Sequence, residues 1–411
     1  MIDSLHECVD VPHDAAVVLR RELGINPDEE PRIILIAGPG DVAGTFDHWV
    51  KGEHDPRVPV VTYSSMFYSL IRKLDARALL LTEPDRLPES QDERITFVRT
   101  PHERPNGRWR WWWASYRFSR TVLRAIKAYD PHLVIAGTDT PSWVVPGLAP
   151  NIKVVVSAHN TFWPMGRRGT SLKAKLREFI IRRAWRRVAS AVCTSQECAR
   201  QIEALVGKPE RLFVQLPQVQ PQNIREIGES EGLKSLFYLG RIEENKGVFD
   251  LLEAFETLAA DHADLTLDFA GDGSADGLLR TRIEASPFCD RIRFYGRLSA
   301  QEVHEKLAVV DALACPTRSS FDEGLGMVVV EAASHGVPCI LSSVVPAKDH
   351  MGDSCEEFPA DDTDALLEAI RKYVIDPNAF AGLRRKIAKK SEMYQDATRS
   401  WGSQLYRAMI S

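Results

Sequence analysis

Short apolar runs rich in β-branched residues alternate with longer helical stretches along this chain, and the alternation restarts after a break near residue 218. The first series of runs covers residues 33–37, 58–62, 78–82, 95–99, 133–136, 153–157 and 190–194; the second covers 235–239, 265–270, 292–295 and 312–315. Strands that alternate with helices favour parallel, doubly wound sheets, and two such series favour two domains. We therefore expect an α/β fold with two sheets.

The break between the two series sets the expected domain boundaries. Residues 218–233 contain proline–glutamine pairs and no strong period, which is typical of a linker. We expect a first domain over 1–217 and a second over 234–390. Residues 394–410 predict one more helix, within a terminal segment over 391–411 that we expect to pack on its own domain or to cross back to the first. Its predicted apolar side consists of Trp401, Leu405, Tyr406 and Met409.

Composition excludes several classes of protein. The apolar runs are far too short to span a bilayer, and the polar, acidic start does not resemble a secretory signal. The seven cysteines include no Cys-x-x-Cys pair, so neither a disulfide framework nor a zinc site is indicated. We expect a cytoplasmic protein. Its net charge of −5 is uneven, because the first 217 residues carry 31 Lys and Arg against 25 Asp and Glu.

Glycines and cations follow the predicted strands of the second half. A glycine at a strand end lets a ligand approach the backbone, and nearby cations can hold a diphosphate. Any one of these turns alone is ordinary, but several at the carboxyl ends of one sheet favour a ligand site. The residues concerned are Gly240, Arg241, Lys246, Gly271, Gly296, Arg297 and Leu298.

Two glutamates flank a glycine-rich loop in residues 320–333. Glu323 lies in the loop after the predicted strand 312–315, and Glu331 lies in a predicted helix over 327–335. Gly324 and Gly326 free the backbone between them, and the free N–H groups at the helix start can seat an anion. Carboxylates accept hydrogen bonds from hydroxyl groups. Together these features suit a sugar nucleotide.

These motifs resemble those of the retaining GT-B glycosyltransferases, specifically glycosyltransferase family 4. The resemblance rests on Gly240-Arg241, Lys246-Gly247 and residues 270–273, 294–296 and 323–332, and it is strongest over 235–345. It implies two Rossmann-like domains that face a cleft. It also implies a UDP- or GDP-sugar donor as substrate and no required cofactor or metal.

The resemblance implies a role for each motif residue. Arg241 and Lys246 would hold the diphosphate and stabilise its charge as the glycosidic bond breaks. Glu323 would position the donor sugar, and Glu331 would bind the ribose hydroxyls. The phosphates and base would be met by Gly240, Gly271, Arg297, Leu298, Gly324, Leu325 and Gly326. Leu325 stands where the family commonly has an aromatic residue, an exchange of one apolar side chain for another.

The first half offers three weaker candidates. Gly40, in the loop 39–45, lacks the spacing of a dinucleotide site or a P-loop, and a plain turn is the alternative. The resemblance implies that this loop borders the acceptor and donor phosphate. His159 falls where family members carry a cleft histidine that contacts the donor sugar; the alternative is a structural hydrogen bonder. Asp139 is a further candidate at a strand end.

Asp362 and Asp364 look like the metal-binding Asp-x-Asp of the other glycosyltransferase fold. They precede a helical pattern, so helix capping is favoured over metal binding.

Two basic stretches contain many apolar side chains. Residues 104–127 carry seven bases and no acid, and residues 166–188 carry nine bases and one acid. The apolar residues interleaved with them are Trp109, Trp111, Trp112, Trp113, Tyr116, Phe118, Leu172, Leu176, Phe179, Ile180 and Ala184. One interpretation is core packing with solvated bases, and the other is an anionic membrane surface. Nucleic acid is disfavoured because the whole chain is acidic.

The sequence hypothesis is a retaining glycosyltransferase of polysaccharide biosynthesis. It would move a sugar from a nucleotide-sugar to a glycan, a lipid-linked or another hydroxyl acceptor, in the cytoplasm or peripherally on the inner face of the membrane. No residue stands out as a covalent nucleophile, so front-face displacement is expected. The alternatives are a phosphorylase or nucleotide-sugar epimerase on the same fold, and a non-catalytic sugar-nucleotide-binding subunit. The donor base, the sugar and the acceptor stay open.

Overall fold

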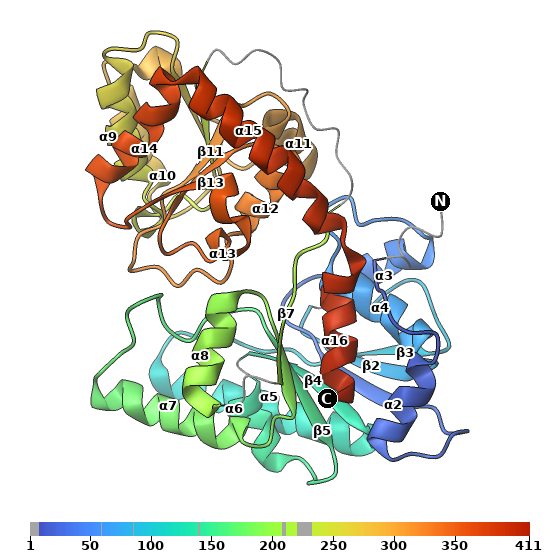
Figure 1. Ribbon diagram of the computed structural model, residues 1–411. Coiled ribbons are helices and arrows are strands. Elements are labelled where there is room, and N and C mark those ends of the chain that lie inside the picture. Colours follow the sequence, from blue (N-terminus) through green and yellow to red (C-terminus); the bar gives the residue numbers. More distant parts are fainter. Residues whose placement is uncertain (1–7, 59, 85, 139, 208–210, 220–231) are drawn as a thin grey trace. The chain divides into compact units, whose positions relative to one another are not determined.

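The computed structural model describes residues 8–411 except 59, 85, 139, 208–210 and 220–231. The chain forms two compact units (Figure 1). Unit 1 comprises Met1–Asn160, Gly169–Gln218 and Asp396–Ser411, and unit 2 comprises Thr161–Arg168 and Val219–Gln395. Asp139 and most of the predicted linker lie outside the described residues.

Unit 1 is built on a parallel sheet of seven strands in the order β3-β2-β1-β4-β5-β6-β7. The central strands are almost entirely buried because helices cover both faces, which explains their continuous apolar runs. The strands are β1 Arg32–Ile36, β2 Arg77–Thr82, β3 Ile95–Arg99, β4 Leu133–Gly137, β5 Lys153–Ala158, β6 Ser190–Cys193 and β7 Leu212–Val214.

Several helices of unit 1 begin at side chains that cap free N–H groups. Thr62, Ser171 and Ser195 each accept a hydrogen bond from an amide three residues ahead. The helices are α2 Ala15–Leu23, α3 Val42–Val50, α4 Tyr63–Lys73, α5 Arg108–Tyr129, α6 Pro141–Val144, α7 Leu172–Trp185, α8 Gln196–Val206 and α16 Trp401–Ile410.

The terminal helix α16 belongs to the core of unit 1. All four side chains of its predicted apolar side are buried. The packing is close, since a Cβ on Gly402 would lie 2.5 Å from Cγ2 of Val9. The helix starts later than the predicted residue 394 because Ser400 caps it, accepting from the amide of Ser403. The residues before it form 3₁₀ turns at Glu392–Gln395 and Ala397–Arg399.

Unit 2 contains a second parallel sheet, of six strands in the order β10-β9-β8-β11-β12-β13. Its strands are β8 Ser235–Leu239, β9 Thr266–Ala270, β10 Ile292–Phe294, β11 Ala312–Cys315, β12 Cys339–Ser342 and β13 Cys355–Phe358. Its helices are α9 Val248–Ala259, α10 Asp276–Glu284, α11 Ala300–Leu307, α12 Met327–Ser334, α13 Lys348–Met351, α14 Thr363–Ile375 and α15 Pro377–Ser391. The expected α/β class with two doubly wound parallel sheets is confirmed.

Some predicted elements differ from the structure. The strand predicted at 58–62 is wrong: Thr62 is already the cap of α4, and the run contains a proline, which cannot donate to a ladder. The strands β7, β12 and β13 were not predicted. They are short, and the exposed Glu357 in β13 weakens the alternation of that strand.

Each sheet has one point at which the strand order reverses. In unit 2 the chain leaves β8 first toward β9 and β10, and later returns to add β11 beside β8. In unit 1 the corresponding neighbours are β1 and β4. The loops after neighbouring strands of a parallel sheet lie at the same edge, and ligands bind outside the carboxyl ends at such a reversal. A ligand site is therefore expected at the loops after β8 and β11.

Candidate active site

Three strand ends of unit 2 are joined by backbone hydrogen bonds through glycines. The amide of Gly240 donates to Ala270 O at 3.0 Å, and the amide of Gly271 donates to Gly296 O at 2.8 Å. Gly271 has a φ of +136°, and a Cβ there would lie only 1.7 Å from Gly240 O. Glycine at position 271 is thus needed to let the loop after β9 approach the loop after β8.

Lys246 and Glu323 meet across the reversal point of the sheet. Lys246 ends the 3₁₀ turn Glu244–Lys246 after β8, and Glu323 lies in the loop after β11. The Lys246 Nζ donates to Glu323 Oε2 at 2.5 Å, and the two side chains are 14% and 13% exposed. Gly247 lets the two loops pack, since a Cβ there would lie 2.0 Å from Pro316 O. An ion pair this shielded from water is costly to break on one side.

Phe321 lies against both predicted cations. The Lys246 Nζ is 3.8 Å and the Arg241 Cζ is 4.9 Å from the centroid of its ring. Arg241 is about half exposed and donates to Glu243 Oε1 at 3.0 Å. The ring face attracts both positive charges and holds them on one surface. The sequence interpretation missed Phe321, although an aromatic residue two positions before Glu323 was a usable signal.

A second ion pair fixes the start of the same loop. Arg318 donates to both carboxylate oxygens of Asp250 on α9, at 2.7 and 2.6 Å. Its amide donates to Asn245 O at 2.9 Å, which ties the loop after β11 to the turn that carries Lys246. Bidentate arginine pairs fix geometry as well as charge. Arg318 was also missed, because one arginine in a polar loop gives no distinctive pattern.

The glycine-rich loop leaves its amides available. Among the described residues, the N–H groups of Gly324, Leu325 and Gly326 have no hydrogen-bond acceptor. Gly326, with a φ of +90°, precedes α12. The Leu325 side chain is buried and its carbonyl accepts from Ala347, so that side chain packs in the domain. Free amides at a helix start suit a phosphate, so the predicted anion seat is physically reasonable.

Glu331 lies on α12 with its carboxylate largely shielded from water. Burial raises its pKa from 4.5 to about 7. Its carboxylate has no hydrogen-bond partner among the described residues, while its backbone oxygen accepts from Ser334 Oγ at 2.7 Å. A shielded carboxylate without a donor is what a ligand hydroxyl would satisfy.

The raised pKa of Glu331 predicts a pH-dependent stability. Because the folded-state pKa of about 7 exceeds the ordinary 4.5, the folded state holds its proton longer, and the free energy of unfolding falls as pH rises from 4.5 to 7. We expect Glu331→Gln to raise that free energy by at most about 3 kcal/mol at about pH 8 and to change it little at about pH 4. Urea titrations at both pH values measure this.

The matched control is Glu305→Gln, which removes one carboxylate from the exposed side of α11 in the same unit. An equal effect of Glu331→Gln at the two pH values would show that its carboxyl titrates normally.

His159 lies at the carboxyl end of β5 in unit 1. Its amide donates to Thr138 Oγ1 at 2.9 Å, its Nε2 lies 3.0 Å from Ser157 Oγ, and its ring centroid lies 4.8 Å from that of Tyr63. Burial lowers its pKa to about 4, so the ring is neutral at physiological pH. Trp401 Nε1 donates to the same Ser157 Oγ at 2.8 Å. The terminal helix therefore helps to orient the histidine.

Replacing Trp401 with phenylalanine tests this arrangement. The variant loses the donor to Ser157, and we expect the free energy of unfolding to fall by roughly 1–3 kcal/mol. Loosened packing should also admit water, so the His159 pKa measured by NMR should rise toward 6.5. Tyr406→Phe, in the same helix, removes no hydrogen bond among the described residues and should leave the His159 pKa unchanged. An unmoved His159 pKa in the Trp401 variant would contradict the role.

The remaining predicted site residues, Gly40, Arg297 and Leu298, are exposed or half-buried. Gly40 is exposed next to Asp41, which caps α3 by accepting from Gly44 at 2.9 Å. Arg297 is exposed and Leu298 is half-buried. Among the residues that the structure describes, no hydrogen bond or ion pair joins Arg297 or Leu298 to the Lys246–Glu323 pair.

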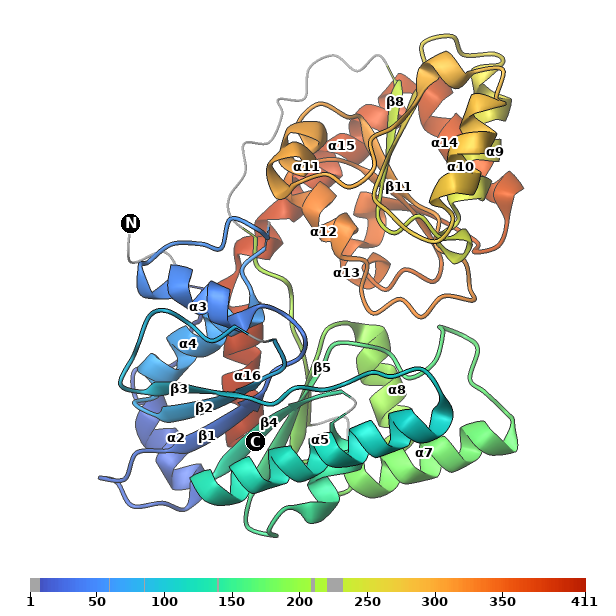
Figure 2. The same cartoon turned by 180° about the vertical axis from the view of Figure 1, so that it is seen from behind.

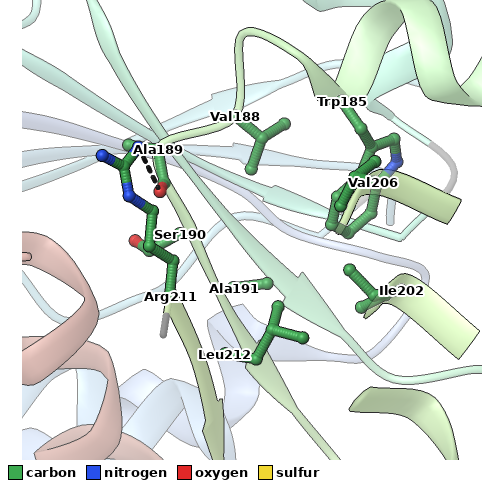
Figure 3. Close-up of a pocket in the computed structure, with 9 residues that line it drawn as sticks. All are labelled: Trp185, Val188, Ala189, Ser190, Ala191, Ile202, Val206, Arg211 and Leu212. Carbon is green, nitrogen blue, oxygen red and sulfur yellow. Dashed lines mark hydrogen bonds between the residues drawn. The ribbon is translucent and has the colours of Figure 1, made fainter. Parts of the chain in front are cut away.

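Two other features are structural. Asp362 accepts from Ala365 N at 2.9 Å and caps α14, as predicted. The shallow apolar pocket drawn in Figure 3 lies between α7, α8 and the strands β6 and β7, and no predicted site residue lines it. Its lining includes Trp185 and Ile202, and Arg211 at its edge donates to Ala189 O. It is a gap in helix-to-sheet packing.

Two family descriptions match this chain. Residues 64–217 match Glycosyltransferase Family 4, and residues 219–393 match Glycosyl transferases group 1. The chain therefore carries two glycosyltransferase-type domains, one in each half. The two matches meet at the boundary between the two sheets.

Two relatives are similar in sequence to part of this chain. Glycogen synthase of Mycobacterium tuberculosis is 31% identical over 170 residues, which cover 40% of this chain and 39% of that enzyme. A GDP-mannose-dependent monoacylated alpha-(1-6)-phosphatidylinositol monomannoside mannosyltransferase of Corynebacterium glutamicum is 27% identical over 166 residues. These residues cover 39% of this chain and 43% of that enzyme. This chain thus spans about two fifths of the length of these relatives.

A solved structure matches nearly the whole chain. Alr3699/HepE of Anabaena, in complex with UDP, aligns with a TM-score of 0.64 at 14% identity, covering 92% of this chain and 98% of that one. Together with the two parallel sheets, this match shows that the fold is GT-B.

Proposed function

We propose that this chain, with its two glycosyltransferase-type domains, transfers a sugar from a nucleotide-sugar donor to a hydroxyl acceptor with retention of anomeric configuration. The observation that carries the proposal is the shielded Lys246–Glu323 pair at the reversal point of the second sheet. It puts a cation for phosphate and a carboxylate for sugar hydroxyls within one hydrogen bond of each other. The free amides of the adjacent loop support the same reading.

The roles follow from charge and position. Lys246 and the more exposed Arg241 would bind the donor diphosphate, and their charge would stabilise it as the bond to the sugar breaks. Glu323 would accept from donor-sugar hydroxyls while staying beside Lys246. Glu331 would accept from the ribose. Because these cations can supply the positive charge, the proposal requires no metal ion.

The proposed chemistry is a front-face displacement. The bond between the anomeric carbon and the phosphate oxygen breaks, and the acceptor oxygen bonds to that carbon from the same face. The acceptor proton passes to the leaving phosphate. His159, neutral because of its lowered pKa, would donate or accept a hydrogen bond without carrying charge.

The acceptor is proposed at the level of class. A glycan or a lipid-linked sugar fits the relatives, one of which is named for a phosphatidylinositol mannoside. The same relative is named for GDP-mannose, and the Anabaena protein was solved with UDP, so both bases belong in the first screen.

Thermal-shift screening against UDP-, GDP- and ADP-sugars tests donor binding directly. A ligand at 100 times its Kd stabilises the folded state by about 2.7 kcal/mol, which is easily measured. One nucleotide-sugar should raise Tm in wild type and less in Lys246→Met. If no nucleotide-sugar raises Tm, the proposal is wrong.

The product then separates the enzyme classes. Transfer to an added acceptor is the expected result. Free sugar phosphate or an epimer formed without acceptor would indicate the phosphorylase or the epimerase instead, and binding without any turnover would indicate a non-catalytic subunit.

A further inference from the structure

The helix α7 is apolar on both sides. Its inner side packs Ile181, Ala184 and Trp185 into unit 1. Its outer side exposes Leu172, Leu176, Phe179 and Ile180, spaced so that they form one stripe along the helix, with Leu172 85% exposed. A surface helix normally keeps its outer side polar. The interpretation that these residues belong to the core is therefore wrong for this stripe.

The helix α5 exposes a second stripe, of aromatic residues. Trp109, Trp113 and Tyr116 recur at intervals of four and three positions, so they share one side of the helix, and Trp109 is 85% exposed. The rings of Trp113 and Tyr116 stack at 5.7 Å. The buried side of α5 is marked by Val122 and Ile126. Folding of unit 1 does not account for the exposed rings.

The two stripes lie on the same side of unit 1. Both helices contact the short helix α6, and Trp111 and Trp112 of α5 pack edge-on against Trp143 of α6 at 5.6 and 4.9 Å. Figure 1 shows α5, α6 and α7 along one side of the unit, and Figure 2 shows α5 and α7 side by side from behind. We call the exposed surface of these two helices the α5–α7 face.

Positive charge surrounds both stripes. The two helices carry eleven Lys and Arg and a single Glu, although the chain as a whole has a charge of −5. Arg110, Arg117 and Arg124 recur every seven residues beside the aromatic stripe and are exposed. Among the described residues, no carboxylate pairs with these three arginines. The positive charges of these three arginines are therefore available to an anionic surface.

We propose that the α5–α7 face binds an anionic lipid bilayer. The aromatic and aliphatic stripes would enter the headgroup region, and the flanking bases would lie at the lipid phosphates. Exposed tryptophans favour this depth of a membrane. An extended, almost acid-free face with apolar stripes on two neighbouring helices fits a flat, negatively charged partner better than a polynucleotide, which would not need the aliphatic stripe. The proposal is independent of the sugar transfer proposed above.

Co-sedimentation of the full chain with vesicles tests the proposal without any sugar donor. We expect binding to vesicles of equal parts phosphatidylcholine and phosphatidylglycerol, weaker binding to pure phosphatidylcholine, and a blue shift of tryptophan emission on binding. Added salt should weaken binding because it screens the bases. Replacing Arg110, Arg117 and Arg124 with glutamine should lower partitioning roughly a hundredfold.

A second variant tests the apolar stripe. Leu176→Ser with Phe179→Ser should abolish the partitioning without unfolding the chain, since both side chains are exposed. The matched control is Leu278→Ser with Ile375→Ser, two exposed apolar residues of unit 2, which should bind as wild type does.

Three results would overturn the proposal. The first is that the wild-type chain does not bind vesicles. The second is that it binds neutral and anionic vesicles equally and that salt does not weaken the binding. The third is that the chain associates with itself and that only the Leu176/Phe179 variant abolishes this association. The last would assign the face to contacts between copies of this chain.

Discussion

Replacing Lys246 with methionine is expected to lower the rate of sugar transfer by roughly 10²–10³-fold. Lys246 Nζ is shielded from water, hydrogen-bonded to Glu323 and held over the ring of Phe321. In such surroundings a charge interacts with a developing phosphate charge far more strongly than it would in water. Methionine keeps the length of the side chain and its contact with the ring but removes the charge. Steady-state kinetics with the donor found by thermal shift measure the loss.

The control for charge removal is Lys372→Met on α14. Lys372 pairs with Glu356 on the surface of the same unit, so its loss should change stability little and transfer not at all. Glu323→Gln provides the complementary variant, since it keeps a hydrogen-bond acceptor beside Lys246 but removes the negative charge. Wild-type-like turnover in both Lys246→Met and Glu323→Gln would contradict the assigned roles.

Replacing Gly271 with alanine is expected to destabilise unit 2 by about 3 kcal/mol or more. The new Cβ would lie 1.7 Å from Gly240 O, and the φ of +136° is one that alanine avoids. The loops after β8 and β9 would have to separate, which would also displace the turn that carries Arg241. We expect both a lower urea midpoint and a loss of the thermal shift caused by the donor.

The measurement benefits from the distribution of tryptophan. Of the nine tryptophans, only Trp163 lies in unit 2. Tryptophan fluorescence therefore reports mainly the unfolding of unit 1, whereas far-UV circular dichroism reports the unfolding of both units. The matched control is Gly277→Ala, in α10, where a Cβ would meet nothing within 4 Å. It should stabilise by roughly 0.5–1 kcal/mol because alanine favours the helix. Equal midpoints for the two alanine variants would show that the close approach at Gly271 is not required.

Much of the fold could be predicted because it depends on local pattern. Parallel strands covered on both faces, such as β1 and β8, appear as uninterrupted apolar runs, and capping residues such as Asp362 stand next to the helix they cap. Short strands such as β7 lack enough residues to show a period. They become strands only because a neighbouring strand supplies the hydrogen bonds.

The candidate site was predictable where the backbone itself demands glycine. Gly271 is required by the close approach of two loops, and Gly240 is favoured by its φ of +152°. Such requirements show in the sequence. Phe321 and Arg318 act through partners distant in the chain, Lys246 and Asp250, so only the folded structure reveals them. Burial is likewise set by tertiary packing, and the sequence could not tell that Leu176 and Trp109 would face outward.

The position of α16 has a consequence for synthesis of the chain. The hydrophobic core of unit 1 contains Trp401, Leu405 and Met409. Unit 2, by contrast, consists of the continuous stretch Val219–Gln395 and the short earlier segment Thr161–Arg168. On the ribosome, the second sheet can therefore close its core while the first still lacks its last helix. Nascent domains usually fold in the order in which they emerge. Here the domain translated first is completed last, and until then its unfinished core offers an apolar surface for chaperones.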